Sequence, residues 1–354
     1  MLIPTIWFIL GLISLIWGAE ILVRSSSKLA ASLGVSKLVI GLTVVAFGTS
    51  APELAVGIEA GLLGEPDILM GNVIGSNLTN TLLILGLASL IIPLQVHKNL
   101  IRFDLPVMIA ATLILILLSL NNVISFWECV LLFVCLCVYL YALVRFSGKS
   151  PLPDEEEIES DSPLKNGLFS LLGLAMLILG ARWMVESATI FAVTAGVSEL
   201  VIGLTIVAIG TSLPEIVTSI LAAVRGEKDL AVGSIVGSNI LNILSVIGIS
   251  GLFISGIPVQ DTLLRVEYLI LMGVSVLCFP IFFTGRKIKR IEGFIFVTGY
   301  VLYLFYLYLD SITSTFMDPF LNGVFYGFIP LVLIYLVFAL IIEFRTRKAD
   351  ASTK

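Results

Sequence analysis

The fold is decided by a stretch of about 50 residues that occurs twice in the chain. Residues 41–90 read GLTVVAFGTSAPELAVGIEAGLLGEPDILMGNVIGSNLTNTLLILGLASL, and residues 203–252 read GLTIVAIGTSLPEIVTSILAAVRGEKDLAVGSIVGSNILNILSVIGISGL. The two stretches align without a gap, and nearly half of their positions are identical. Self-similarity of this length indicates that one structural unit was duplicated within the chain.

The composition around the repeat is that of a polytopic membrane protein. Of the 354 residues, 58% are hydrophobic and 13% are charged, and the mean hydropathy is +1.10. Soluble domains carry about 25% charged residues. The apolar residues fall in runs of roughly 18–25, enough for a helix to cross about 30 Å of hydrocarbon. We therefore predict an all-α membrane protein with spans near residues 3–22, 36–62, 68–92, 101–120, 125–146, 165–185, 198–224, 229–254, 262–283, 290–310 and 320–342.

The basic residues predict the orientation of these spans. If the amino terminus lies outside, all but two of the 20 Lys and Arg residues, Arg182 and Arg265, fall on the cytoplasmic side. This bias is what the positive-inside rule requires. We expect a multi-pass protein of the cell (plasma or inner) membrane with its carboxyl terminus in the cytoplasm. Because the chain has no basic patch, nucleic-acid binding is excluded.

The repeat predicts an inverted architecture. The copies are offset by five predicted spans, an odd number, so they enter the membrane from opposite sides. Inverted-topology repeats are typical of secondary transporters, whose binding site lies at the repeat interface near the midplane. The charged residues that flank the two copies fit this inversion, because equivalent positions carry opposite charges. Within each copy, one oppositely charged pair also has the four-residue spacing of helix-surface ion pairs. The corresponding residues are Glu20 and Arg24 with Arg182 and Glu186, and Lys37 with Glu199.

Four segments follow from this arrangement. A first five-helix repeat covers 1–146 and a second covers 164–310. Between them, 147–163 contains three prolines and an acidic run, which predicts a solvated cytoplasmic linker; a weak calcium-sensing or regulatory role is the alternative. The remainder, 311–354, adds an eleventh transmembrane helix and a basic tail.

Each copy contains the motif GTS-x-PE within an otherwise apolar helix. Pro52 and Pro214 have no N–H to donate, and each ring clashes with the carbonyl four residues earlier, so we predict a kink or break. Carbonyls released at membrane depth need protein, water or a cation as a partner. Beside each break stands a carboxylate, with a threonine four residues before it on the same helix face. These pairs are Glu53 with Thr49 and Glu215 with Thr211.

A carboxylate at membrane depth usually marks an ion pathway, and a structural ion pair is the alternative. Neither broken helix contains a Lys or Arg near its glutamate. Because the copies are inverted, Glu53 and Glu215 can face one another near the midplane. Carboxylates, freed carbonyls and hydroxyls form an all-oxygen site, which suits Ca²⁺ and disfavours zinc and copper.

The next helix of each copy carries G-x-x-x-G-S-N-x-x-N. The glycines have the small-xxx-small spacing that lets two helix backbones approach closely. Ser76 and Asn80 stand four residues apart on one face, as do Ser238 and Asn242, so their oxygens can complete the cation site. Hydrogen bonding between helices is the alternative. The full sets are Gly71, Gly75, Ser76, Asn77 and Asn80, and Gly233, Gly237, Ser238, Asn239 and Asn242.

GTSAPE with GNVIGSNLTN, and GTSLPE with GSIVGSNILN, resemble the two alpha-repeats of the sodium/calcium exchanger family within the cation/calcium antiporter superfamily, in its prokaryotic form. The resemblance implies that Ca²⁺ and Na⁺ share Glu53 and Glu215. The other ligands it implies are Thr49, Ser50, Ser76, Asn80, Thr211, Ser212, Ser238, Asn242 and backbone carbonyls near Ala46 and Ala208. Prokaryotic relatives and potassium-dependent exchangers carry Asp where this chain has Asn242, which disfavours potassium cotransport.

The predicted function is secondary active antiport of Ca²⁺ against Na⁺ by alternating access, and not enzymatic catalysis. The expected partners are the two transported ions and the lipid bilayer, with no cofactor. H⁺/Ca²⁺ or K⁺-dependent antiport is the alternative, since a glutamate pair can also hold protons. A cation channel could use the same ligands. An intramembrane hydrolase has no support from an H-E-x-x-H or Gly-x-Ser-x-Gly motif.

Overall fold

The computed structural model describes residues 2–146, 162–195, 208–254, 256–259 and 264–352. Within these ranges, nine helices are long and apolar enough to cross a membrane, and a bent helix pair makes a tenth. They match ten of the eleven predicted spans. The remaining one, predicted at 198–224, is described only from residue 208 onward. The acidic run of the linker and Glu199 lie outside the described residues.

The first repeat begins with a long helix and continues with a broken one. Its elements, in order, are α1 (Leu2–Leu33), α2 (Lys37–Ile40), the π-helical turn η1 (Gly41–Val45), α3 (Ala46–Thr49), α4 (Ala51–Leu63), α5 (Pro66–Leu78), the π-helical turn η2 (Thr79–Ile84), α6 (Leu85–Ile91), the π-helical turn η3 (Leu100–Asp104), α7 (Leu105–Leu118) and α8 (Phe126–Phe146).

The second repeat follows the same plan. Its described elements are α9 (Pro163–Thr194), α11 (Ala208–Thr211), α12 (Leu213–Val224), α13 (Lys228–Leu241), the π-helical turn η5 (Asn242–Ile247), α14 (Gly248–Leu252), α15 (Leu264–Phe283) and α16 (Arg290–Ser311). Three further elements form the additional helix, namely α17 (Met317–Gly323), η6 (Val324–Phe328) and α18 (Ile329–Ser352).

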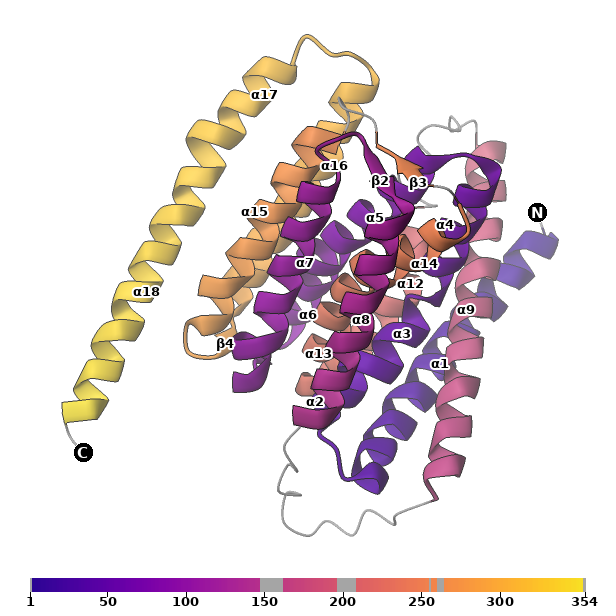
Figure 1. Ribbon diagram of the computed structural model, residues 1–354, viewed down its shortest axis with the longest axis horizontal. Helices are drawn as coiled ribbons and strands as arrows, with labels where there is room; N and C mark the ends of the chain where they lie inside the picture. The colour runs from indigo at the N-terminus through magenta and orange to yellow at the C-terminus, as the bar shows by residue number, and fades with distance from the viewer. Residues whose placement is uncertain (1, 147–161, 196–207, 255, 260–263, 353–354) are drawn as a thin grey trace.

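Two short antiparallel ribbons reflect the inversion of the repeats. β1 (Leu94–Gln95) pairs with β4 (Lys287–Ile288), and β2 (Val123–Ser125) pairs with β3 (Gly256–Pro258). β4 lies at one end of the bundle, whereas β2 and β3 lie at the other (Figure 1). Each ribbon joins one strand from each repeat. Shifting β1 by the repeat offset places it on β3, so the two ribbons are counterparts on opposite sides of the membrane.

The helices that carry the repeated motifs lie in the interior. The apolar stretch of the span from Lys228 to Leu252 is entirely buried inside the protein, whereas only 17% of that in the C-terminal span is buried. α13 packs against α12 and also against α2, η1 and α3 of the first repeat. The central contacts therefore join one repeat to the other, which is where an inverted-repeat transporter places its site.

α1 and α9 form a closely packed antiparallel pair. A Cβ atom added at Gly18 would lie 2.8 Å from the carbonyl oxygen of Gly173, and one added at Gly11 would lie 2.8 Å from that of Gly180. Contacts this short are possible only where neither helix has a side chain. Figure 1 shows this pair at one side of the bundle and α18 at the opposite side.

The eleventh helix is attached to α15 and α16 by polar contacts. Tyr335 of α18 donates a hydrogen bond to Glu292 at the start of α16, at 3.0 Å. Near its other end, Glu343 accepts one from the backbone N–H of Gly285, at 2.9 Å. The buried Glu292 carboxylate also caps the first turn of α16. The added helix thus covers the outside of the bundle, away from the motif helices.

Candidate functional site

Both GTS-x-PE motifs break their helices, as the prolines predict. In the first repeat, Ser50 leaves the helical conformation with φ −82° and ψ 5°, and the helices on either side of it are bent by 44°. In the second, Ser212 has φ −91° and ψ 8°. Each proline then lies in the first turn of the next helix, where its missing N–H breaks no hydrogen bond. Glu53 and Glu215 stand in the same first turns.

The two glutamates meet across the repeat interface. Each is 1% exposed. Ser50 donates a long hydrogen bond of 3.4 Å to Glu215 Oε1, and the Thr49 side chain also lies beside this carboxylate. The Ser76 side chain lies beside the Glu53 carboxylate, and the two carboxylates are close enough to repel one another. Residues of the first repeat therefore contact Glu215 of the second repeat, close to Glu53 of the first.

Several oxygen atoms around the pair have no hydrogen-bond partner among the residues that the structure describes. Buried polar groups in proteins nearly always have one, so their concentration indicates a place for an ion or water. Ca²⁺ takes about six to eight oxygen ligands. The unpaired buried oxygens on the predicted ligand residues are Glu53 Oε2, Glu215 Oε2, Ser212 Oγ, Ser238 Oγ, Asn80 Oδ1 and Asn242 Oδ1.

The donor set contains only two carboxylates. Among the residues that the structure describes, no group of three or more His, Cys, Asp or Glu side chains could hold a metal. The other available ligands are hydroxyls, amides and carbonyls, which suit Na⁺ and Ca²⁺ and carry no further charge. Such a site has a total charge of −2 when both glutamates are ionised.

The remaining predicted ligands lie on the same short helices. The Ala46 carbonyl is buried and accepts two hydrogen bonds, from the Ser50 N–H at 3.0 Å and from Thr49 Oγ1 at 3.3 Å. An ion bound by this carbonyl would take the place of the longer of these bonds, the one from Thr49. Ala208 and Thr211 bound α11, the counterpart of α3.

A chain of asparagines links the two second motifs. Asn242 donates to Asn77 Oδ1 at 3.1 Å, and Asn77 donates to the Asn239 carbonyl at 3.3 Å. Asn239 in turn donates to Thr81 Oγ1 at 2.7 Å. Asn77 and Asn239 are not among the predicted ligands, although both stand in the GSN motif. Asn242 thus bonds between helices through its amide nitrogen, while its oxygen stays unpaired.

The second-motif helices are not regular. The sequence predicts an uninterrupted α-helix, but π-helical turns span Thr79–Ile84 and Asn242–Ile247. Asn80 and Asn242 lie in these turns, so the regular α-helical geometry assumed for the four-residue spacing ends at each of them. Single π-helical turns occur frequently at functional sites, because the wider turn redirects side chains. The sequence contains no proline here that would signal the change.

The glycines of the second copy provide close packing, as predicted, whereas a Cβ atom added at Gly71 or Gly75 of the first copy would meet no atom within 4 Å among the described residues. A Cβ atom added at Gly237 would lie 2.8 Å from the Cβ atom of Ala46 and 2.9 Å from the Leu42 carbonyl oxygen. One added at Gly233 would lie 3.0 Å from the Leu38 carbonyl oxygen. α13 thus rests directly on the broken helix of the first repeat.

Ion pairs surround the turn between α12 and α13. Arg225 forms an ion pair with Glu20 of α1, with a contact of 2.8 Å to Oε1 and a hydrogen bond of 3.0 Å to Oε2. Lys37 binds Glu227 at 2.7 Å. Glu20 also pairs with Arg24, and Arg182 pairs with Glu186 within α9, so the two predicted helix-surface pairs are confirmed. The contacts that join the two repeats were not predicted, since nothing in the sequence places this turn beside α1.

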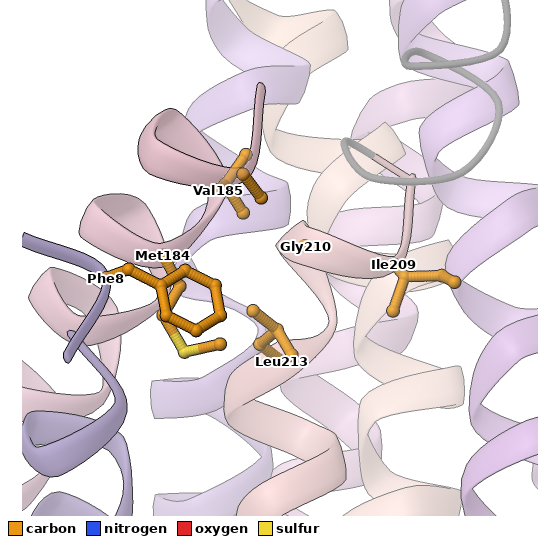
Figure 2. Close-up of a pocket in the computed structure, with 7 residues that line it drawn as sticks. Phe8, Met184, Val185, Ile209, Gly210 and Leu213 are labelled. Atoms are coloured by element: carbon orange, nitrogen blue, oxygen red, sulfur yellow. The ribbon is translucent and has the colours of Figure 1, made fainter. Parts of the chain in front are cut away.

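The cavity in Figure 2 is a different feature. Its volume is about 260 Å³, and Phe8 of α1, Met184 and Val185 of α9, and Ile209, Gly210 and Leu213 around the second break lie along it (Figure 2). The lining side chains carry no oxygen atoms, so they cannot replace the hydration shell of a cation.

Comparison with known proteins places the chain among exchangers. The family model for the sodium/calcium exchanger protein matches residues 3–145 and 165–309. A putative antiporter, CaxA, of Alkalimonas amylolytica is 36% identical over 87% of this chain and 99% of its own length. The sodium/calcium exchanger MaX1 of Methanosarcina acetivorans is 33% identical over 85% of this chain and 97% of its own. A solved structure of the sodium-calcium exchanger NCX_Mj superimposes with a TM-score of 0.76 at 32% identity, covering 85% of this chain and 98% of that one.

Proposed function

Because the chain belongs to the sodium/calcium exchanger protein family, we propose that it exchanges Ca²⁺ for Na⁺ across a membrane by alternating access. The observation that carries the proposal is the pair of opposed, buried glutamates, Glu53 and Glu215, surrounded by unpaired oxygen atoms. Two carboxylates neutralise one Ca²⁺. The same charge can be balanced by Na⁺ ions at neighbouring oxygens, so the two cations compete for the site.

The proposed ligands are the twelve residues that the resemblance implies. The glutamates supply the charge, and hydroxyl and amide oxygens complete the coordination shell. Carbonyl oxygens near the two breaks supply the rest. The set is Glu53, Glu215, Thr49, Thr211, Ser50, Ser212, Ser76, Ser238, Asn80, Asn242, Ala46 and Ala208.

We further propose that α1 and α9 move together as the rocking unit. Their glycine contacts make them one packed pair, and they lie beside both broken helices. Moving the pair relative to α12 would open one side of the site and close the other. In the predicted orientation, Arg225 and the linker face the cytoplasm. Residues 1–146 and 164–310 are the two inverted repeats that together form the transport unit.

The proposal is tested by Ca²⁺ uptake into proteoliposomes that contain the purified protein. Na⁺, K⁺ and H⁺ gradients are imposed one at a time, with the membrane potential clamped. We expect an outward Na⁺ gradient to drive Ca²⁺ uptake and the other two gradients to have little effect. Uptake that is driven by H⁺ and indifferent to Na⁺ would overturn Na⁺ coupling. Ca²⁺ flux down its own gradient without a counter-ion would identify a channel.

Arg225→Gln is expected to favour opening on the Arg225 side. The variant removes the ion pair between the α12–α13 turn and Glu20 of α1. Because this ion pair is partly exposed to solvent, it stabilises the closed state by only about 0.2–1 kcal/mol. The apparent affinity of a ligand scales with the population of the competent state. The half-saturating Ca²⁺ concentration on that side should fall by about two- to fivefold, as measured in vesicles of known orientation.

Arg182→Gln is the matched control, because it removes an ion pair that lies within α9 alone. Glu20→Gln should reproduce the effect, and the double variant should add little to either single one, because both remove the same contact. An unchanged half-saturating concentration in Arg225→Gln would show that this pair does not hold the closed state.

A further inference from the structure

Three buried hydroxyls of the second repeat stand next to the glutamate site and have no assigned role. Thr218 and Ser219 follow Glu215 by about one turn on α12, and Ser234 precedes Ser238 by one turn on α13. Each is at most 1% exposed, and none of the three hydroxyl oxygens has a hydrogen-bond partner among the described residues.

The contacts of the first repeat fix how α12 and α13 face one another. There, the Ser76 side chain lies beside the Glu53 carboxylate, and the side chain of Asn72 donates to the Glu53 carbonyl at 3.0 Å. Glu53 thus lies between positions 72 and 76 of the neighbouring helix. The repeat offset predicts the same neighbours on α13 for Glu215, namely Ser234 and Ser238. In this copy the Ser238 hydroxyl has no hydrogen-bond partner among the described residues.

Thr218 lies on the same face of α12 as Glu215, one turn toward Arg225. The two helices are antiparallel neighbours joined by a short connection. A position one helical turn closer to Arg225 on α12 therefore faces a position one helical turn closer to Lys228 on α13. Thr218 therefore stands opposite Ser234. This register predicts that their hydroxyls and the backbone carbonyl of Glu215 face the same space, about 5 Å (one helical turn) beyond the glutamate, on the Arg225 side.

The first repeat has no such place. The counterpart of Thr218 is Val56, that of Ser219 is Gly57, and that of Ser234 is Asn72. The longer Asn72 side chain reaches the Glu53 carbonyl and bonds it. In the second repeat the shorter Ser234 leaves its own hydroxyl unpaired. The space beside Glu215 is therefore lined by unpaired hydroxyls, whereas the equivalent space beside Glu53 is not.

We propose that Thr218, Ser234 and the Glu215 carbonyl form an accessory station for a partly hydrated Na⁺ ion, on the Arg225 side of the glutamate pair. Three neutral oxygens provide no negative charge to offset the free-energy cost of dehydrating Ca²⁺, whereas a monovalent ion that keeps some of its water can bind there. Ser219 lies on the adjacent face of α12 and lines the approach. This inference rests on the proposed use of Na⁺ as the counter-ion.

The test compares wild-type protein with the double variant Thr218→Val/Ser234→Ala in detergent without Ca²⁺. Na⁺ and Ca²⁺ are titrated separately, and the rise in unfolding temperature reports binding. We expect the half-saturating Na⁺ concentration to rise by about five- to tenfold and the Ca²⁺ value to change by less than twofold. In oriented vesicles, the Na⁺ dependence should weaken only on the Arg225 side.

Ser250→Ala is the matched control, because it also removes an unpaired buried hydroxyl, but from α14 at the other end of the span. If the double variant does not fold, Ser234→Asn replaces it, since it introduces the residue found at the equivalent position of the first repeat; the same rise in half-saturating Na⁺ is expected. A Na⁺ dependence within twofold of wild type in the folded variant would overturn the station. A wild-type protein that Ca²⁺ stabilises and Na⁺ does not would overturn the proposed counter-ion together with it.

Discussion

Glu53→Gln and Glu215→Gln are each expected to reduce Na⁺-driven Ca²⁺ uptake by at least about 100-fold. Either variant leaves one carboxylate to face a divalent ion in a buried site, so one positive charge stays uncompensated. Removing one partner of a buried ion pair costs about 3–5 kcal/mol, and each 1.4 kcal/mol is a factor of ten in affinity. Alanine at either position should abolish exchange altogether. Uptake of ⁴⁵Ca²⁺ into proteoliposomes measures the effect.

The matched control is Glu59→Gln, which removes an exposed carboxylate from the same helix, α4. This variant should transport as the wild type does. A second readout separates a ligand role from a structural one. In ion-free buffer, Glu53→Gln should unfold at the same or a higher temperature than wild type, because it removes a buried carboxylate that faces another one. Substantial exchange by either glutamine variant would contradict the site.

Gly237→Val is expected to give the second-largest effect, this time through packing. The added Cβ atom would lie 2.8 Å from the Leu42 Cα atom and 2.9 Å from the Leu42 carbonyl oxygen. Since these are backbone atoms, no rotamer change relieves the clash, and α13 must move away from the first repeat. Overpacking of this kind typically costs about 1–3 kcal/mol. The shift also separates Ser238 from Ala46, so exchange should fall at least tenfold in the protein that still folds.

Gly273→Val is the control for this substitution, because a Cβ atom at Gly273 of α15 would meet no atom within 4 Å among the described residues. Its unfolding temperature and its transport rate should match those of the wild type. A Gly237→Val protein with a normal unfolding temperature and normal exchange would show that the close contact between α13 and the broken helix is not needed.

The architecture could be predicted from the sequence because its causes are local or periodic. Hydrophobic run length gives the spans, and the duplication with its odd offset gives the inversion. The proline of each GTS-x-PE motif gives the break, and the lack of any basic neighbour singles out the two glutamates. Each of these signals lies within a short window of residues.

The details that the sequence left out depend on contacts between distant segments. The Asn242–Asn77 bond and the Arg225–Glu20 pair each join the two repeats. The π-helical turns around Asn80 and Asn242 arise where packing overrides the regular helix, so local propensity gives no warning of them. The proposed accessory station likewise depends on how α12 and α13 face one another, which no local sequence signal gives.

The central claim is that one cation binds between the two glutamates at the repeat interface. Anomalous diffraction from crystals soaked in Ca²⁺ without Na⁺ tests it most directly. The account predicts a peak about 2.3–2.6 Å from a carboxylate oxygen of both Glu53 and Glu215, which disappears when the crystals are transferred to Na⁺. A Ca²⁺ peak away from these residues, or one bound by a single glutamate and unaffected by Na⁺, would contradict it.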